Sequence, residues 1–259
     1  MKTCNFCIDL IIRAGEMLQE KRKEAFSVSF KDDNPKDVVT SLDIEMNDFI
    51  TAEIQKYYPE HTIYSEEASE VAGNECQWAI DPIDGSAAFA RGIPQYAISI
   101  GLLEGGAPVL GVVYDPATRE LFSYEKGKGV FLNGEPVVAS IESDLKSSFV
   151  LFAAGRKDEQ REWAGESFKR LLGSVHKTKN FSSSALALCY VASGRIEGVV
   201  AGTFTTRDIA AAIGMVYEQG GVVLTEDGNT AALRKSPQRV FIGNTRKTAE
   251  DLISLLMVE

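Results

Sequence analysis

The sequence predicts an α/β fold of the α+β kind, organised as two subdomains. Three observations support this prediction: two amphipathic helical patterns open the chain, a series of short β-like segments follows, and strands alternate with helices after about residue 140. We expect an N-terminal α+β subdomain over residues 1–140 and a C-terminal α/β subdomain over residues 141–259. The length of 259 residues and the hydrophobic content of 44% are ordinary for a folded globular protein.

The N-terminal part begins with two predicted helices. Residues from about Cys4 to Ala25 carry one apolar stripe, and residues from about Leu42 to Tyr58 carry another, which Pro59 ends. The polar segment Lys31–Asp37 joins them, and we interpret it either as a mobile lid or as a plain solvated linker. Cys4 and Cys7 lie on the first apolar stripe, so we interpret both thiols as packing residues rather than as zinc ligands.

The middle of the chain has the pattern of an antiparallel meander, because turn residues separate short β-like segments. These segments are 62–64, 77–80, 97–103, 109–114 and 120–124. After about Ser140 the pattern changes to strands at 149–153 and 196–200 and helices at about 159–172, 183–192 and 208–219. This change of pattern sets the expected subdomain boundary.

Charge and hydropathy exclude several classes of protein. The net charge of −10 argues against a nucleic-acid partner, since such binding rests on clustered Lys and Arg. No stretch approaches the roughly 20 apolar residues of a membrane span. Asp9, Arg13 and Glu16 interrupt the first apolar run, so we predict no signal peptide and expect a reduced, cytoplasmic protein.

The segment Asp81-Pro82-Ile83-Asp84-Gly85-Ser86 is the most informative in the chain, because it places two carboxylates three residues apart after an apolar strand. Pro82 favours extended backbone before it and so gives Asp81 a defined direction. Gly85 permits a tight turn, and Ser86 begins a short predicted helix whose first N–H groups attract anions. The alternative is an ordinary Asp-Gly turn; an EF-hand fits less well, because apolar residues interrupt its alternating ligand positions.

Further acidic residues lie at the ends of other predicted elements, where side chains from distant positions converge on a rigid scaffold. They are Asp43, Glu66, Glu67 and Asp208. Oxygen ligands without His or Cys favour Mg²⁺ or Mn²⁺ over zinc. The alternatives are a helix-cap role for Asp208 and a solvated loop for Glu66 and Glu67.

Six segments carry a family resemblance, in order over nearly the whole chain. They are Asp37–Asp43, Ser65–Ser69, Trp78–Phe89, Gly129–Gly134, Ser183–Arg195 and Arg207–Ala212. These segments resemble the inositol monophosphatase family, within the lithium-sensitive, metal-dependent phosphatase superfamily that includes fructose bisphosphatase and the nucleotide bisphosphate phosphatases. An Asp-Pro-Ile-Asp-Gly corner with an upstream Glu-Glu and a downstream Asp-x-Ala-Ala is a specific combination.

The resemblance implies a layered α/β/α/β/α sandwich of the inositol monophosphatase/fructose bisphosphatase type. It implies Mg²⁺-dependent hydrolysis of phosphate monoesters by in-line attack of a metal-activated water, without a phosphoenzyme. By the same resemblance, Asp43 and the hydroxyl of Ser86 would orient and deprotonate that water. The amides of Gly85 and Ser86 would hold phosphate oxygens.

The resemblance also implies the metal ligands. One Mg²⁺ site would use Glu66, Asp81 and the backbone carbonyl of Ile83, and a second would use Asp81, Asp84 and Asp208. Two or three ions are expected, with Mn²⁺ as a substitute.

Several positions bear on the substrate. Asp84, Gly85, Ser86, Ser183, Ser184, Arg207 and Asp208 are the expected substrate- or phosphate-binding residues. Ser183 and Ser184 begin a helix, either as caps or as contacts to a substrate hydroxyl. Arg207 stands where inositol-selective members usually carry Trp, and Ala201 stands where they place a Glu. Together with Gly92-Ile93-Pro94, these residues resemble the dual inositol monophosphate and fructose bisphosphate type.

Two alternatives remain beside a phosphatase for inositol monophosphate or sugar phosphates. Within the family, the substrate would instead be histidinol phosphate or a nucleotide bisphosphate. In a different class, the protein would be a catalytically weak relative that binds metal or sugar phosphate as a regulator. The presence of every expected carboxylate favours the enzyme. The resemblance further implies a homodimer and a small phosphorylated metabolite as the partner.

Overall fold

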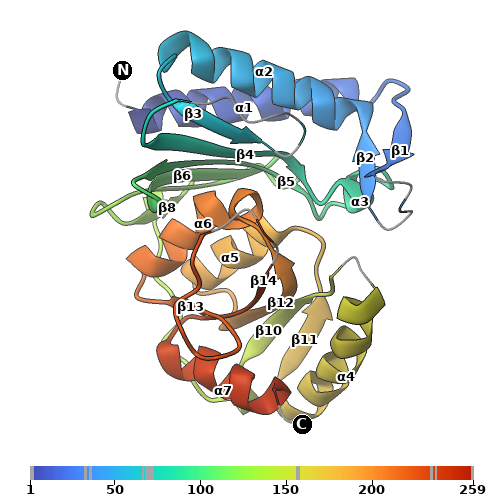
Figure 1. Cartoon of the computed structure of the whole chain (residues 1–259), viewed down its shortest axis with the longest axis vertical. Coiled ribbons are helices and arrows are strands. Elements are labelled where there is room, and N and C mark those ends of the chain that lie inside the picture. The colour runs from blue at the N-terminus through green and yellow to red at the C-terminus, as the bar shows by residue number, and fades with distance from the viewer. Residues whose placement is uncertain are drawn as a thin grey trace.

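The computed structural model describes residues 3–31, 34, 37–65, 67, 73–155, 158–233, 236 and 238–257, with the backbone alone at 158, 159 and 206–208. Five layers alternate through the molecule: two helices, a seven-stranded sheet, two helices, a five-stranded sheet and two further helices (Figure 1). The expected α/β/α/β/α sandwich is confirmed. The change of sheet occurs between residues 136 and 149, and a division into two subdomains near residue 140 stays a prediction.

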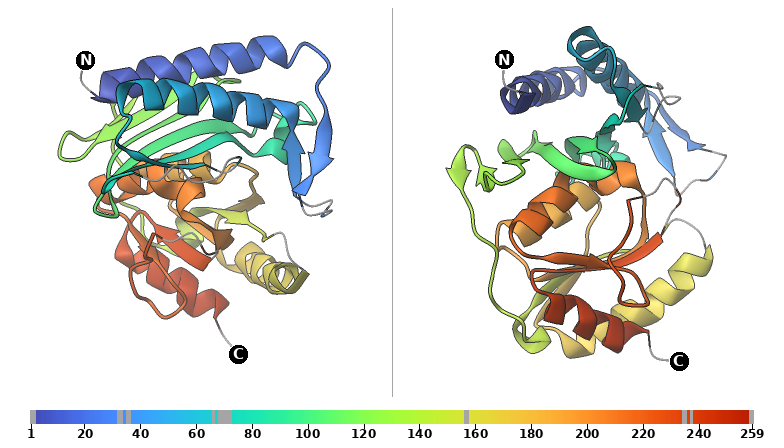
Figure 2. Two further views of the ribbon diagram at one scale, coloured as in Figure 1. Left: turned by 45° about the horizontal axis from the view of Figure 1, so that its top comes forward. Right: turned by 60° about the vertical axis from the view of Figure 1, so that its left-hand side comes forward.

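The seven-stranded sheet carries helices α1 (Thr3–Lys21) and α2 (Ser41–Tyr57) on its outer face (Figure 2). Its strands, in spatial order, are β3 (Thr62–Ser65), β4 (Cys76–Asp84), β5 (Ala97–Glu104), β6 (Ala107–Asp115), β7 (Glu120–Glu125), β8 (Val130–Leu132) and β9 (Glu135–Pro136). Strands β4 to β9 form the expected antiparallel meander, whereas β3 runs parallel to β4. Because successive strand residues face opposite sides, Ile80 packs under α1 and α2 while Asp81 faces the other way.

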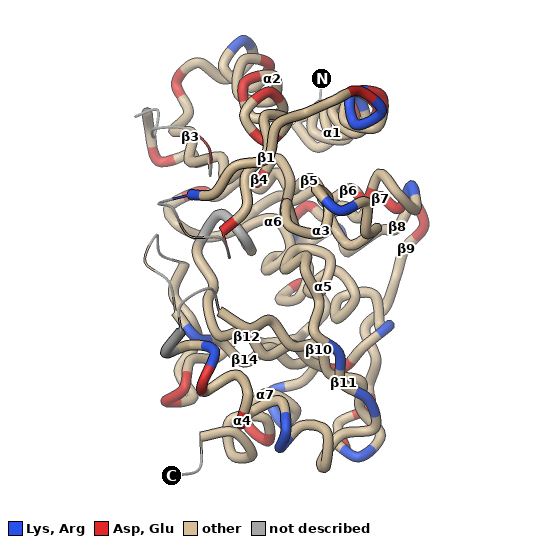
Figure 3. The backbone as a smooth tube through the Cα atoms, turned by 90° about the vertical axis from the view of Figure 1, so that its right-hand side faces the viewer, with Lys and Arg blue, Asp and Glu red and all other residues tan. Residues whose placement is uncertain are grey.

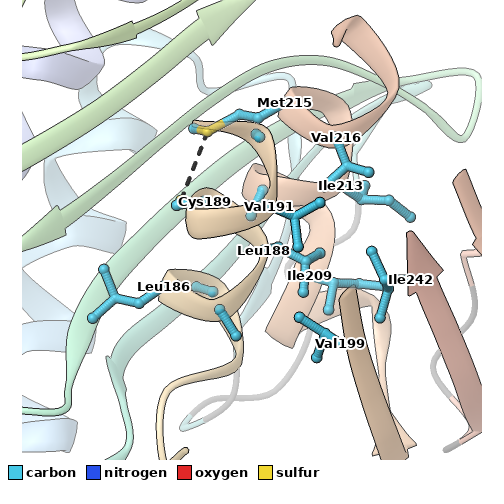
Figure 4. Packing of buried hydrophobic residues seen from close by; sticks show 14 of the residues in the cluster. Leu186, Leu188, Cys189, Val191, Val199, Ile209, Ile213, Met215, Val216 and Ile242 are labelled. Atoms are coloured by element: carbon cyan, nitrogen blue, oxygen red, sulfur yellow. Dashed lines mark hydrogen bonds between the residues drawn. The ribbon is translucent and has the colours of Figure 1, made fainter. Parts of the chain in front are cut away.

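The middle layer consists of α5 (Ser184–Ala192) and α6 (Thr206–Glu218), which lie between the two sheets. Their apolar side chains interlock with those of the five-stranded sheet, as Figure 4 shows for Leu188, Ile209, Val199 and Ile242. In the same cluster the Cys189 sulfur lies 3.8 Å from that of Met215. Burial raises the pKa of the Cys189 thiol, so this cysteine is a neutral packing residue.

Helix α6 approaches the seven-stranded sheet very closely at two glycines. A Cβ atom at Gly111 would lie 2.1 Å from the backbone oxygen of Ala211, and one at Gly101 would lie 2.7 Å from the Ala211 nitrogen. Only the absence of a side chain on these strand residues permits this contact. The small residues on both sides therefore hold the helix whose first turn contains Asp208 against β5 and β6.

The five-stranded sheet is mixed. In spatial order its strands are β11 (Lys177–Asn180), β10 (Phe149–Ala153), β12 (Gly198–Phe204), β14 (Gln238–Gly243) and β13 (Val222–Leu224). Helices α4 (Asp158–Ser174) and α7 (Arg246–Leu256) cover its outer face, near the short 3-10 turn η2 (Leu145–Ser147). Figure 3 shows basic segments around β11 and α7. Lys177 and Lys179 stand on the edge strand β11, where charge opposes pairing with another chain.

Two small elements lie at one end of the seven-stranded sheet. Strands β1 (Val28–Phe30) and β2 (Val38–Thr40) form an antiparallel pair, and the single-turn helix α3 (Ser86–Phe89) follows β4. Helix α3 begins at the residue that the sequence predicts. Among the described residues, no helix is both long enough and apolar enough to cross a membrane.

Some boundaries differ from the prediction, and β4 is the difference that matters for the site. This strand does not end at Ile80 but continues through Asp84, with a register shift between Asp81 and Asp84. Pro82 falls within that irregularity, where it need not donate a ladder hydrogen bond. Both carboxylates therefore stay on paired strand backbone. Likewise, α6 starts at Thr206, so Asp208 lies inside its first turn rather than before it.

Candidate active site

Asp43 stands in the first turn of α2, and the start of that helix fixes its carboxylate. Thr40 is the N-cap, and its backbone N–H and hydroxyl both donate to Asp43 Oδ2, over 2.8 Å and 2.5 Å. This reciprocal arrangement is a capping box with Asp in the place of the usual Glu. Asp43 is 1% exposed. Its Oδ2 atom therefore serves the helix, and its Oδ1 atom faces the loop after β4.

The Ser86 hydroxyl lies between Asp43 and the backbone of Ile83. Ser86 Oγ is 2.7 Å from Asp43 Oδ1 and 2.9 Å from the Ile83 carbonyl oxygen. Since the hydroxyl has one proton, it donates to one of these acceptors at a time. The preceding residue, Gly85, has φ +100°, and a Cβ atom there would lie 2.6 Å from the Gln95 oxygen. The turn thus requires glycine for two reasons.

Asp81 is joined to the same set through Ile83. Its Oδ1 atom accepts from the Ile83 backbone N–H at 3.1 Å, while the Ile83 carbonyl faces Ser86. That carbonyl oxygen keeps a second lone pair for another partner. Asp81 is 3% exposed, so its carboxylate is almost completely inside the protein. Asp43, Ser86, Ile83 and Asp81 consequently form one continuous hydrogen-bonded set at the end of β4.

Asp84 connects this end of β4 to the middle layer. Its carboxylate accepts from the Ser183 hydroxyl at 2.5 Å and from the backbone N–H groups of Ser184 and Ala185 at 3.2 Å and 2.7 Å. A carboxylate in this place is stabilised by the unpaired N–H groups and the dipole of α5. Ser183 is the N-cap of α5 and also accepts from the Leu186 N–H. The capping role expected as one alternative is present, and contact of Ser183 or Ser184 with a substrate stays a prediction.

The structure describes the remaining predicted site residues only in part. Glu66 lies outside the described residues, and for Arg207 and Asp208 only the backbone, in the first turn of α6, is described. Among the described side chains, no three His, Cys, Asp or Glu residues form a group able to hold a metal ion.

The segment Lys31–Asp37, interpreted as a lid or a linker, is described in part. Lys31 pairs with Glu67 over 2.5 Å, whereas positions 32, 33, 35 and 36 lie outside the described residues.

The structure shows two features that support the site and that the sequence did not predict. One is Thr40, which the spacing Thr-x-x-Asp at a helix start would have indicated. The other is a clamp on α3: the Tyr96 hydroxyl accepts from Gln19 Nε2 and Arg22 Nη1, both at 2.8 Å. The Arg22 guanidinium also lies 5.7 Å from the ring centres of Phe89 and Tyr96. Burial raises the pKa of Tyr96, which keeps it a neutral acceptor.

Comparison with known proteins agrees with the geometry. Residues 2–257 match the model of the inositol monophosphatase family. Inositol monophosphatase 1 of Solanum lycopersicum is 35% identical over 230 residues, which cover 86% of this chain and 84% of the relative. Fructose-1,6-bisphosphatase/inositol-1-monophosphatase of Thermotoga maritima is 32% identical over 231 residues, covering 89% and 88%.

A solved structure supports the same assignment over the whole fold. The crystal structure of the extragenic suppressor protein suhB from Bartonella henselae superposes with a TM-score of 0.90 at 30% identity, covering 97% of each chain. The match extends through both sheets and all three helical layers. On this evidence the chain belongs to the inositol monophosphatase family of phosphatases.

Proposed function

We propose that the protein is a Mg²⁺-dependent phosphate monoester hydrolase that acts on inositol monophosphate and on sugar phosphates such as fructose bisphosphate. The observation that carries this proposal is the hydrogen-bonded set of Asp43, Ser86, Ile83 and Asp81, in which Ser86 is half-buried and the others are buried, with Asp84 beside it. The set brings a base, a hydroxyl and oxygen ligands together at the turn that opens α3. This combination suits the transfer of a phosphoryl group to water.

The donor atoms fit a hard divalent cation. Asp81, Asp84 and the Ile83 carbonyl supply oxygen only, and the side chains of Glu66 and Asp208 would complete the ligand set. Bound Mg²⁺, as two or three ions with Mn²⁺ as a substitute, would supply Lewis-acid stabilisation of the charge on the phosphoryl oxygens. Cys189 is not a candidate ligand, because its sulfur faces Met215.

Asp43 and Ser86 would move the proton of the attacking water. Thr40 occupies Asp43 Oδ2, so Oδ1 is the atom that receives the Ser86 proton. As the water attacks phosphorus, Ser86 Oγ accepts a proton from it and passes its own proton to Asp43 Oδ1. The bond from phosphorus to the ester oxygen breaks as the new bond forms, and the departing alkoxide takes a proton from solvent. One proton thereby leaves the water and one arrives at the carboxylate. The Ile83 carbonyl, 2.9 Å from Ser86 Oγ, holds the hydroxyl in position during this exchange.

The start of α3 would hold the phosphate. The backbone N–H groups of Gly85 and Ser86 come at the first turn of a helix, where no intrahelical carbonyl is available to them. N–H donors in this position add positive potential where the reaction spreads negative charge. The clamp of Tyr96 and Arg22 supports this turn, because both side chains contact the Phe89 ring of α3.

Two residues support a broad or dual substrate range. Ala201 is fully buried and offers no carboxylate to the hydroxyls of inositol. Arg207, in the first turn of α6, brings a cation that suits a second phosphate. The Thermotoga maritima relative that carries both activities in its name is 32% identical to this chain, which supports the same range here.

Phosphate release by the purified protein tests the proposal. Inositol monophosphate, fructose bisphosphate, histidinol phosphate and adenosine bisphosphate are compared with and without Mg²⁺. We expect turnover of the first two in Mg²⁺ only, and a loss of at least about 100-fold in Asp81→Asn. Asp9→Asn, which changes an exposed carboxylate on α1, is the matched control and keeps wild-type turnover.

The same experiment decides between the alternatives. A preference for histidinol phosphate or adenosine bisphosphate would overturn the substrate range but not the reaction. Equal inactivity of wild type and Asp81→Asn on every substrate would favour a regulatory binding protein. The homodimer implied by the family is checked separately by analytical ultracentrifugation.

A further inference from the structure

Ser99, in the middle of β5, is a buried polar residue whose hydroxyl is not satisfied. It is 0% exposed, and its Oγ atom has no hydrogen-bond partner in the part of the chain that the structure describes. A buried hydroxyl without a partner loses its hydrogen bonds to water and gains none in exchange. Such a group calls for an explanation, and a role beside a bound ion is one.

The position of Ser99 in the sheet points to Asp81. The two residues stand directly opposite each other in the antiparallel pair of β4 and β5. Side chains so paired lie on one face of the sheet, with Cβ atoms about 4.5–5.5 Å apart. The neighbour of Ser99 on the other side, in β6, is Val113, which is apolar and belongs to the core beneath α5 and α6. Asp81 is therefore the polar cross-strand neighbour of this hydroxyl.

Helix α6 closes the space above Ser99 and Asp81. Gly101, two residues along β5 on the same face, lies against the backbone of Ala210 and Ala211. The first turn of α6, which contains Asp208, is within one helical turn of this contact. Ser99 is thus enclosed between a β-sheet carboxylate, an apolar neighbour and the start of a helix, at the place where the cation ligands are proposed to converge.

We infer that Ser99 is a positioning residue of the cation site. When a divalent cation is bound at Asp81, the Ser99 hydroxyl forms the hydrogen bond that it lacks among the described residues, to the Asp81 carboxylate or to a water that the site takes up with the cation. A donor of this kind orients a carboxylate ligand and improves its affinity for the metal. This inference rests on the proposed function, because it requires that Asp81 bind a cation.

The inference makes opposite predictions for metal-free and metal-bound protein, which a purely structural serine would not show. In Ser99→Ala, the metal-free melting temperature is expected to equal or exceed that of wild type, because the substitution removes an unsatisfied group. The dissociation constant for Mn²⁺, measured by calorimetric titration, is expected to rise about 10-fold. Ser99→Cys keeps the volume and a weak S–H donor, so its affinity is expected to fall between the two.

Ser148→Ala is the matched control. Ser148 is also 0% exposed, but its hydroxyl donates to the Asp144 carbonyl at 2.8 Å, and no predicted ligand contacts it. This variant is expected to lower the metal-free melting temperature and to leave the Mn²⁺ affinity unchanged.

The outcomes separate the inference from the proposed function. If wild type binds Mn²⁺ and Ser99→Ala binds it equally well, Ser99 has no part in the cation site and the inference is overturned alone. A metal-free melting temperature that falls in Ser99→Ala as it does in Ser148→Ala also overturns it, because the hydroxyl then has a partner without the cation. If wild type itself binds no divalent cation, the proposed function fails and the inference fails with it.

Discussion

Ser86 Oγ lies 2.7 Å from Asp43 Oδ1, while Thr40 holds the other oxygen of the same carboxylate. The Asp43 carboxylate thus stabilises the start of α2 with one oxygen and faces the candidate site with the other. Asp43→Asn keeps an oxygen for the cap but removes the base, so we expect turnover to fall about 10²- to 10⁴-fold. The unfolding free energy should change by no more than about 1–2 kcal/mol. Phosphate release and urea unfolding check both values, and a variant with near wild-type turnover would exclude Asp43 as the base.

Thr40 should affect catalysis through Asp43. Thr40→Val keeps the shape of the side chain but removes the hydroxyl that donates to Asp43 Oδ2. We expect a loss of about 1–2 kcal/mol in stability and a fall in kcat, because the carboxylate loses the hydroxyl that donates to its Oδ2 atom. Thr40→Ser keeps the donor and is expected to retain kcat within about 2-fold. Equal kcat values for the two variants would show that Thr40 serves the helix alone.

The clamp on α3 predicts an effect on substrate binding. Tyr96→Phe removes the acceptor shared by Gln19 and Arg22, and leaves their donors without that partner. We expect a stability loss of about 1–3 kcal/mol. A rise in KM larger than the fall in kcat should accompany it, because the turn that would hold phosphate is less rigid. Arg91→Ala is the control, since Arg91 is exposed and donates a hydrogen bond to the Ala87 carbonyl of α3 without contacting the Tyr96 hydroxyl. A wild-type KM in Tyr96→Phe would exclude a supporting role for the clamp.

The carboxylate corner was predictable because its causes are local. Pro82 restricts the backbone and Gly85 frees it, each within a few residues. Such local effects can be predicted from the sequence alone. The contacts that complete the site are not local. Ser86 meets Asp43 from 43 residues away, and Ser183 meets Asp84 from 99 residues away. The family resemblance grouped these residues, but their hydrogen bonds depend on how the layers stack.

The same distinction applies to the fold. Helix α2 and strand β10 agree with the prediction to within a residue. Helix α2 buries one periodic set of apolar side chains, and β10 is a short, continuous apolar run that is buried on both faces of its sheet. Strand β11, Lys-Thr-Lys-Asn, was missed because it is an edge strand that is mostly exposed and has no apolar alternation. The extension of β4 through Asp84 was missed for another reason: pairing with β5 outweighs the tendency of Pro82 to end a strand.

His61 should make stability depend on pH. Its ring stacks on Trp78 and lies tilted against Tyr58, and burial lowers its pKa, against a smaller opposing effect of Glu104. Since histidine in the unfolded chain titrates near about 6.5, the unfolded state binds more protons than the native state just below that pH. Stability is therefore fully present above about pH 6.5 and is lost as the pH falls through the native pKa of His61.

Thermal unfolding between about pH 7.5 and pH 5 measures this effect. The melting temperature of wild type is expected to fall toward the acid end, and the fall should be smaller in His61→Gln. His176→Gln, which replaces the other histidine of the chain, should keep the wild-type slope. Identical slopes in wild type and His61→Gln would assign the acid sensitivity to other groups.

The close contact between α6 and the sheet gives the last prediction. Gly111→Ala would place a Cβ atom 2.1 Å from the Ala211 oxygen, and relief requires a shift of the whole helix. We expect a loss of about 3 kcal/mol in the free energy of unfolding. Turnover should fall as well, since the first turn of α6 carries Asp208.

Gly165→Ala is the matched substitution, because Gly165 is exposed in the middle of α4 and a Cβ atom there meets nothing within 4 Å. It should instead stabilise the protein by about 0.5–1 kcal/mol, since alanine loses less conformational entropy in a helix. Urea unfolding of both variants measures the difference in sign. If Gly111→Ala were as stable as Gly165→Ala, the sheet would have room for a side chain, and the position of Asp208 would depend on something other than this contact.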